Sequence, residues 1–167
     1  MIRDQNGTFS AAFVCTGNIC RSPMAEALAR YIITKNNIGG LHFTSAGTHG
    51  YHVGERPDPR TLALLKQRGI ETQGLRAKKF TVRDFEAHDV ILGLDQGHVE
   101  SLLALASPEY YPKIHLLMPF AQKGRVYPFD SYDVPDPYYG AAQEFEEVYK
   151  MLEWACASLL QWRADKT

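Results

Sequence analysis

The chain has 167 residues, 45% of them hydrophobic, which is the size and composition of one domain with a sizeable core. Its net charge of −1 gives no sign of the basic face or tail that nucleic-acid-binding proteins carry, so no nucleic-acid partner is expected. The apolar runs are too short to cross a bilayer, and the polar N-terminus lacks the apolar core of a signal peptide, which favours a cytoplasmic protein with no membrane partner. We expect residues 1–167 to form a single domain, in which residues 1–9 are a flexible tail.

Strand-like and helix-like segments alternate along the chain. In chain order, the pattern predicts a strand over 10–14, a helix over 23–37, a strand over 41–45, a helix over 58–68, a short helical turn over 82–87, a strand over 89–94, a helix over 96–106, a strand over 113–117, a long loop over 124–139 and a helix over 141–163. This alternation is typical of an α/β fold whose parallel sheet is covered by helices on both faces. Ligands of such sheets bind at the carboxyl ends of the strands, near the point where the strand order reverses.

The segment after the first strand combines a cysteine and an arginine in a tight turn. Cys15 ends the strand and Arg21 follows six positions later, just before the first predicted helix. A strand-to-helix turn presents free backbone N–H groups that bind phosphate-like anions, and an arginine can hold two oxygens of such an anion. The same field should lower the pKa of Cys15, which places a thiolate nucleophile beside the anion. This arrangement indicates a cysteine-dependent phosphatase.

Small residues complete this turn. Gly17 is expected to supply a backbone conformation that a side chain would forbid. Ser22 is predicted as the N-cap of the following helix, with Pro23 at its first position, and the Ser22 hydroxyl could also hydrogen-bond the thiolate. We therefore expect the turn to be a preformed anion cradle.

A phosphatase of this kind needs a second group, which protonates the leaving oxygen and later activates water. The long loop offers three aspartates, Asp130, Asp133 and Asp136, each among prolines and aromatic residues. Their chemistry alone does not rank them. No pair of histidines has the spacing of metal ligands, and the three cysteines do not have the spacing of a zinc site, so we expect neither a metal nor another cofactor.

These motifs resemble those of a known family. The segment 14–23 resembles the signature loop of the low-molecular-weight protein tyrosine phosphatases, and 134–140, Val-Pro-Asp-Pro-Tyr-Tyr-Gly, resembles their general-acid loop. Weaker similarity lies at 44–48, 52–54 and 57–60, and the resemblance extends from about Phe13 to the last helix. It implies a four-stranded parallel sheet of flavodoxin-like order and a single phosphatase domain that hydrolyses phosphotyrosine through a phosphocysteine intermediate.

The resemblance also implies roles for individual residues. Asp136 becomes the general acid, Tyr138 and Tyr139 line the wall that holds the aromatic ring of the substrate, and Ser45 hydrogen-bonds Asn18, whose residue type tolerates left-handed backbone angles. The remaining implied phosphate-binding and substrate-binding residues are Thr16, Gly17, Asn18, Ile19, Cys20, Ser22 and Tyr51.

Two positions depart from the family pattern, and two further cysteines need an interpretation. Many members have a tryptophan in place of Tyr51, and a histidine near Leu75 that supports the loop asparagine, so substrate preference and loop support are expected to differ. In the family, Cys20 can form a disulfide with the nucleophile that protects it from irreversible oxidation. Cys156, on the last predicted helix, is expected to be a core residue.

The expected partner is a phosphotyrosine protein and, if the source is bacterial, a tyrosine autokinase of polysaccharide export. The family tends toward monomers with weak self-association. Two alternatives stay open: an arsenate reductase on the same scaffold and a non-catalytic phosphotyrosine-binding module. The first is disfavoured because thioredoxin-coupled reductases use two further cysteines, whereas none lies between Cys20 and Cys156. The second is disfavoured because Cys15, Arg21 and Asp136 are all present.

Overall fold

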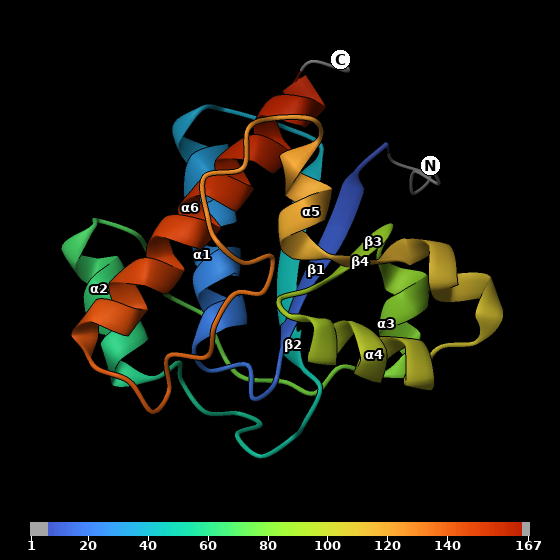
Figure 1. The fold of residues 1–167 in the computed structure, drawn as a ribbon, viewed down its shortest axis with the longest axis horizontal. Helices are drawn as coiled ribbons and strands as arrows, with labels where there is room; N and C mark the ends of the chain where they lie inside the picture. Colours follow the sequence, from blue (N-terminus) through green and yellow to red (C-terminus); the bar gives the residue numbers. More distant parts are fainter. Residues whose placement is uncertain (1–6, 165–167) are drawn as a thin grey trace.

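The computed structural model describes residues 7–164 (Figure 1). Four strands are present, β1 (Phe9–Cys15), β2 (Leu41–Gly47), β3 (Val90–Gly93) and β4 (Ile114–Leu116). The helices are α1 (Arg21–Lys35), α2 (Pro59–Gln67), α3 (Val82–Ala87), α4 (Gln96–Leu105), α5 (Leu117–Gln122) and α6 (Ala142–Ala164), with a 3-10 helix, η1, over Pro108–Lys113. None of these helices is long and apolar enough to cross a membrane.

The four strands form one parallel sheet in the order β2-β1-β3-β4. β1 is central and pairs with β2 through Cys15 opposite Gly47, and with β3 through Val14 opposite Gly93. The strand order therefore reverses between β1 and β3, and the loops after these two strands diverge at the position where α/β sheets bind ligands. The predicted four-stranded, flavodoxin-like sheet is confirmed.

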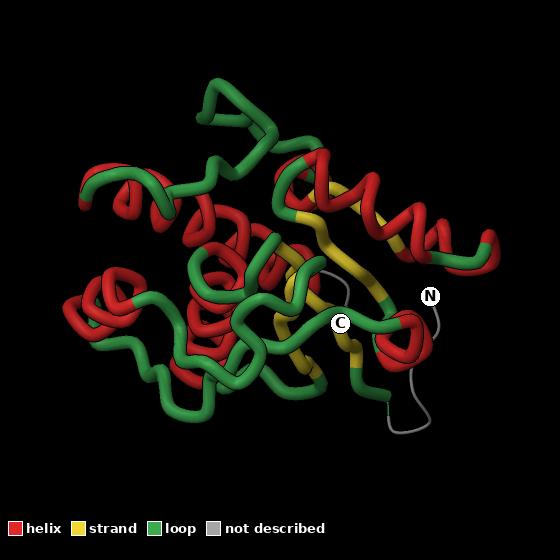
Figure 2. The backbone as a smooth tube through the Cα atoms, turned by 90° about the horizontal axis from the view of Figure 1, so that it is seen from below, coloured by secondary structure: helices red, strands yellow, loops and turns green. Residues whose placement is uncertain are grey.

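Helices cover both faces of the sheet, which makes three layers (Figures 1 and 2). One core cluster joins the sheet to α1, α5 and α6 through fully buried side chains such as Phe13, Leu28, Leu117 and Leu152. A smaller cluster on the other face joins it to α3 and α4. Because both faces are buried, β3 is apolar along its whole length, as expected for a central parallel strand.

Three local predictions need correction. Helix α1 begins at Arg21 after Cys20, so Ser22 is not the N-cap. The short helices η1 and α5 were not predicted, because each spans only 6 residues, with Pro112 inside η1 and Pro119 inside α5, too short to develop a helical period. Of the predicted flexible tail, residues 1–6 lie outside the described residues, whereas Phe9 is buried at the start of β1.

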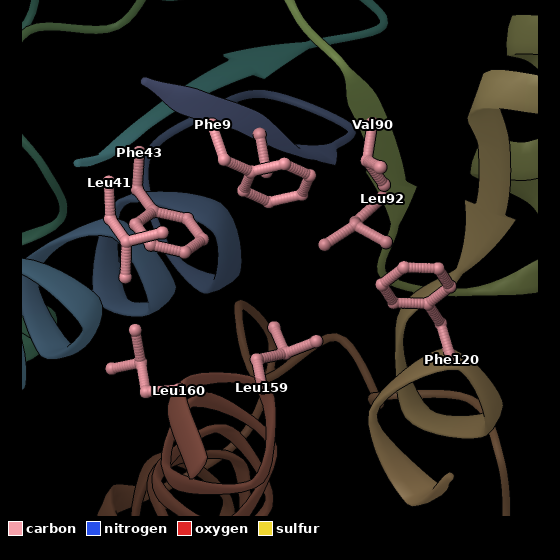
Figure 3. A pocket seen from close by; sticks show the side chains of 9 residues that line it. Phe9, Leu41, Phe43, Val90, Leu92, Phe120, Leu159 and Leu160 are labelled. Atoms are coloured by element: carbon pink, nitrogen blue, oxygen red, sulfur yellow. The ribbon is translucent and has the colours of Figure 1, made fainter. Parts of the chain in front are cut away.

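A small apolar cavity lies at the amino end of the sheet, on the side of α6 (Figure 3). It measures about 10 Å³, and its lining is apolar, with Phe9, Phe43, Leu92 and Leu159 among the surrounding side chains. That volume is close to the minimum for one water molecule, and the lining offers no polar partner. The cavity is therefore a packing defect of the core, at the opposite end of the sheet from the signature segment.

Candidate active site

A pocket of about 280 Å³ opens beyond the carboxyl ends of β1 and β2. Its lining comes from the loop after β1, from the segment after β2 and from the loop before α6. These parts of the chain contribute Cys15, Thr16, Gly17, Ile19, Cys20, Arg21, Tyr51, His52, Asp136, Tyr138 and Tyr139. The fold thus brings together nearly all of the predicted site residues; Asn18, Ser22 and Ser45 lie behind the pocket and contact its loop.

Cys15 lies at the end of β1, where its sulfur meets the side chain of Ser22. The Cys15 Sγ and Ser22 Oγ atoms are 2.8 Å apart, and both residues are buried. Asn18 Nδ2 donates to the same Ser22 oxygen at 2.8 Å, so the hydroxyl hydrogen of Ser22 is left to point elsewhere. Its available acceptors are Cys15 Sγ and the Ala46 carbonyl, which is more distant at 3.4 Å. Ser22 is therefore placed to donate a hydrogen bond to a Cys15 thiolate.

Asn18 determines the shape of the loop. Its φ of 58° is left-handed, a conformation that asparagine tolerates better than most residues. Its amide donates to Ser22 and, at 2.9 Å, to Ser45 Oγ, and its Oδ1 accepts from the backbone N–H of Lys78 at 3.0 Å. Leu75 makes no contribution to this amide, yet the backbone of Lys78 and the two serine hydroxyls satisfy it. The loop therefore has its support without the histidine that is absent here.

Space is limited at Gly17 and requires glycine at position 47. The left-handed residue of the loop is Asn18, which corrects the conformational role predicted for Gly17. A Cβ at Gly17 would lie 3.1 Å from Cδ2 of His52. At Gly47, where the end of β2 passes beneath the loop, a Cβ would lie 2.7 Å from the Thr16 carbonyl oxygen, closer than backbone atoms can yield.

Arg21 is almost completely buried and held from behind the pocket. Its Nη1 donates to Asp95 Oδ2 at 2.8 Å and to the Val134 carbonyl at 3.0 Å. Asp95 is the N-cap of α4, since its Oδ1 accepts from the backbone N–H of His98. Burial works against the charge of Asp95, but His98 and Arg21 outweigh it and lower the pKa of that carboxyl group. The guanidinium is therefore oriented before any anion binds.

His98, like the pocket-lining His52, is a site residue that sequence reasoning missed. It is only 4% exposed and lies behind Thr16, with its Nε2 2.9 Å from Thr16 Oγ1 and 3.3 Å from Arg21 Nη2. Its Nδ1 accepts from the backbone N–H of Asp95, which makes a reciprocal capping box. The signal was the spacing, because an N-cap aspartate followed three positions later by a side chain with an acceptor is a capping-box pattern.

The structure also separates the three loop aspartates. Asp136 lines the pocket, half-exposed, with Oδ2 3.7 Å from Arg21 Nη2 and Oδ1 accepting from the Tyr138 N–H. Asp133 instead accepts from the backbone N–H of Gln96, at the start of α4. Asp130 lies in a different surface groove, together with Pro128 and Lys150. Only Asp136 of these three can reach a leaving group in the pocket.

Aromatic side chains form the rim. Tyr51 is mostly exposed and stacks on His49, with ring centroids 5.1 Å apart, whereas Tyr138 is partly exposed. Tyr139 contacts the Tyr138 ring edge-to-face and is 94% exposed. Arg60 donates to the carbonyls of Tyr138 and Gly140 and so ties the acid loop to α2. Three tyrosines therefore contribute aromatic side chains to the lining of the pocket.

The second cysteine of the loop differs from the first. Burial, together with the negative charge of Asp58, raises the pKa of Cys20 to about 12. Cys20 is therefore a neutral thiol at physiological pH, and Cys15, with its serine partner, is the better placed nucleophile. Cys156 is buried on α6, as predicted for a core residue, and burial raises its pKa to about 12 as well. Among residues 7–164, no group of three or more His, Cys, Asp and Glu side chains could hold a metal ion.

Stability should decrease as the pH falls from about 6.5 to about 4, because folding keeps His98 neutral. Burial and the charge of Arg21 lower its pKa to about 4, so the unfolded chain binds more protons in this window. One such group changes the free energy of unfolding by at most about 1.4 kcal/mol per pH unit. Urea unfolding at several pH values should give a shallower pH dependence for His98→Gln than for the wild type; equal slopes would contradict the assignment.

Comparison with known proteins agrees with the fold and the pocket. The sequence profile of the low molecular weight phosphotyrosine protein phosphatase family matches residues 10–166. The chain is 43% identical over 157 residues to the low molecular weight protein-tyrosine-phosphatase of Streptomyces coelicolor, across 92% of both proteins. It is 36% identical over 160 residues to the low molecular weight phosphotyrosine protein phosphatase of Homo sapiens, across 94% of this chain and 97% of the human one.

A solved structure gives the same result in three dimensions. The crystal structure of YfkJ from Bacillus subtilis superposes with a TM-score of 0.87 at 34% sequence identity, covering 98% of this chain and 99% of that chain. The matched residues of the sequence profile, 10–166, include both the loop after β1 and the loop before α6. This chain therefore belongs to the low molecular weight phosphotyrosine protein phosphatase family.

Proposed function

We propose that the protein is a protein tyrosine phosphatase that hydrolyses phosphotyrosine through a phosphocysteine intermediate. The observation that carries this proposal is the convergence of Cys15, Arg21 and Asp136 in one pocket, with Ser22 Oγ 2.8 Å from Cys15 Sγ. Family membership supports the reaction class.

In the first step, the Cys15 thiolate attacks phosphorus, so that a sulfur–phosphorus bond forms as the bond to the phenolic oxygen breaks. The backbone N–H groups of the loop and the start of α1 bind the phosphoryl oxygens, and Arg21 adds a fixed positive charge. Since Asp95 and the Val134 carbonyl already hold the guanidinium, it needs little reorganisation during the reaction.

Asp136 acts first as the general acid and then as the general base. A bound phosphoryl dianion disfavours a second negative charge beside it, so the acid form faces the leaving oxygen and protonates the tyrosine product. The resulting carboxylate then accepts a proton from water as the water oxygen attacks phosphorus and the sulfur–phosphorus bond breaks. Ser22 stabilises the departing thiolate through its hydrogen bond.

The rim selects an aromatic substrate. Tyr51 and Tyr138 form an aromatic border around the opening, and the nucleophile lies at the bottom of the pocket, where the ring of a phosphotyrosine brings its phosphorus within reach. Tyr139 is so exposed that its contacts fall on the peptide around the phosphotyrosine. Tyr51, in the place of the more frequent tryptophan, keeps a flat face but adds a hydroxyl to the rim.

The proposal also includes redox regulation, cellular location, substrates and oligomeric state. Cys20 lines the same pocket as Cys15, so peroxide that oxidises Cys15 to a sulfenic acid would be followed by attack of the Cys20 sulfur, forming a disulfide and releasing water. The reaction needs a reduced nucleophile, which fits a cytoplasmic enzyme. Its substrates are phosphotyrosine proteins, with a tyrosine autokinase as the candidate in a bacterial source, and the working form is a monomer that self-associates weakly.

The wild type should hydrolyse both p-nitrophenyl phosphate and a phosphotyrosine peptide in the presence of a thiol reductant and EDTA. Phosphate release is the measurement, and arsenate reduction under the same conditions is the comparison. Binding of the peptide without turnover would indicate the non-catalytic module, and arsenate reduction without phosphate release would indicate the reductase. Activity that disappears with EDTA would also contradict the proposal.

A further inference from the structure

A partly buried chain of hydrogen bonds runs behind the pocket from Asp95 through His98 to Thr16. The Asp95 N–H donates to His98 Nδ1 at 3.1 Å, and His98 Nε2 lies 2.9 Å from Thr16 Oγ1. His98 comes from α4 and Thr16 from the loop after β1, 82 residues apart in the sequence. Thr16 lines the pocket that holds Cys15, so this chain ends at the site itself.

Proton positions along this chain follow from the fixed donors. A backbone N–H can only donate, so the Asp95 N–H requires an unprotonated Nδ1. The Asp95 Oδ1 also lies 3.2 Å from Nδ1, at ion-pair distance, whereas the hydrogen bond at Nδ1 is the one from the Asp95 N–H. Arg21 Nη2 is also a fixed donor and lies 3.3 Å from Nε2, a longer contact than the 3.1 Å hydrogen bond from the Asp95 N–H to Nδ1. Because the shorter of these two contacts is at Nδ1, we assign the proton of the neutral ring to Nε2. Burial and the nearby Arg21 charge lower the pKa of His98 to about 4, which keeps the ring neutral.

The Thr16 hydroxyl then accepts on one side and donates on the other. Its two side-chain neighbours in the described part of the chain are His98 Nε2–H and Arg21 Nη2, at 2.9 and 3.4 Å, and both are donors. The hydroxyl hydrogen has no acceptor in either of them, whereas the pocket that Thr16 lines is the place where a phosphoryl oxygen would sit. We propose that His98 is a positioning residue, which holds the Thr16 hydroxyl as a hydrogen-bond donor to the bound phosphoryl group. This inference rests on the proposed phosphatase function.

Such a donor adds to the backbone cradle in a specific way. A hydroxyl can rotate, and without His98 it could turn its hydrogen away from the anion. With Nε2–H fixed on one side, the hydroxyl hydrogen is directed before the anion arrives, which is the preorganisation that electrostatic stabilisation requires. The interaction involves a neutral ring and an anionic ligand, so no proton is transferred.

Two substitutions at His98 separate its two hydrogen bonds. His98→Gln places an amide N–H near the position of Nε2 and keeps the donor to Thr16, whereas His98→Asn keeps a group near Nδ1 but is too short to reach Thr16. Thr16→Val removes the hydroxyl at constant shape. We expect His98→Asn and Thr16→Val to lower kcat/KM for p-nitrophenyl phosphate and the affinity for inorganic phosphate by about 10- to 100-fold, the range for one charge-assisted hydrogen bond. His98→Gln should restore most of that loss.

The double variant His98→Asn/Thr16→Val decides between positioning and mere packing. If His98 acts through Thr16, the double variant should lose no more than either single variant. Additive losses, or phosphate affinity unchanged in Thr16→Val, would overturn the proposal. So would ¹⁵N NMR spectra of the wild type that place the ring proton of His98 on Nδ1. Urea midpoints confirm that each variant is folded before it is compared.

The readouts keep this inference separate from the proposed function. Calorimetric titration with inorganic phosphate measures anion binding whether or not the protein turns over. If the wild type hydrolyses no phosphate ester, the proposed function fails, but the phosphate affinities still test the role of His98. If the wild type is active and the His98 and Thr16 variants match it in both readouts, only the positioning role fails.

Discussion

Replacement of Cys15 with serine should abolish hydrolysis of phosphate esters while the anion site stays intact. A serine hydroxyl is not ionised near neutral pH, and the side chain that meets the Cys15 sulfur within residues 7–164 is the Ser22 hydroxyl, which cannot act as a general base. The loss should exceed roughly 10⁴-fold, as it does when the nucleophile of another covalent enzyme is removed. The hydrogen bonds of Asn18 that shape the loop do not involve Cys15, so the cradle should keep its conformation.

The measurement is initial-rate hydrolysis of p-nitrophenyl phosphate, combined with calorimetric binding of a phosphotyrosine peptide. Cys15→Ser should bind the peptide without turning it over. Cys156→Ala is the matched control, because Cys156 is buried on α6, where its sulfur faces the Ala25 carbonyl, and that variant should retain activity. A Cys15→Ser protein with more than a few per cent of the wild-type rate would mean that Cys15 is not the nucleophile.

Replacement of Asp136 with asparagine should slow the reaction by about 10²- to 10⁴-fold, the contribution of a positioned general acid. Asparagine keeps an oxygen that can accept from the Tyr138 N–H, so the loop should retain its shape while the acidic proton is lost. The defect should be larger for the phosphotyrosine peptide than for p-nitrophenyl phosphate, since tyrosine is the poorer leaving group and depends more on protonation.

Asp130→Asn provides the control from the same loop. Asp130 does not line the pocket and should tolerate the change with little loss of activity. Rates for aryl phosphates of graded leaving-group acidity should depend more steeply on the leaving group in Asp136→Asn than in the wild type or Asp130→Asn. An equal defect for all leaving groups would show that Asp136 does not supply the proton.

The candidate nucleophile, the arginine and their loop could be predicted because they lie within one short segment. Cys15 and Arg21 are six positions apart, and a strand followed by a helix with a tight turn between them places both at one anion site through local backbone geometry alone. The alternation of strands and helices could be predicted in the same way, because the spacing of hydrophobic residues along a segment is a local property of the sequence. The strand order came only from the family resemblance, since periodicity says nothing about which strands pair.

Other parts of the site depend on contacts between distant segments. Residue chemistry did not rank the three loop aspartates, and the structure separates them because Val134 is anchored twice: its N–H donates to the Leu94 carbonyl, and its own carbonyl accepts from Arg21. This anchoring holds Asp136 over the pocket. Ser22 was predicted as an N-cap because of its position, but the tertiary contacts of Cys15 and Asn18 use its hydroxyl instead.

The sequence by itself therefore determined the chemistry of the loop and the class of the fold, because neighbouring residues interact through the short-range geometry of the backbone. The family resemblance had selected Asp136 from the three aspartates, but only the tertiary structure puts it in one pocket with Cys15 and puts His98 behind Thr16. Both depend on the parallel pairing of β1 with β3, which brings the start of α4 beside the loop after β1. Strand pairing joins residues far apart in the chain. Which strands pair, and in which register, therefore depends on the packing of the whole sheet and on no local pattern.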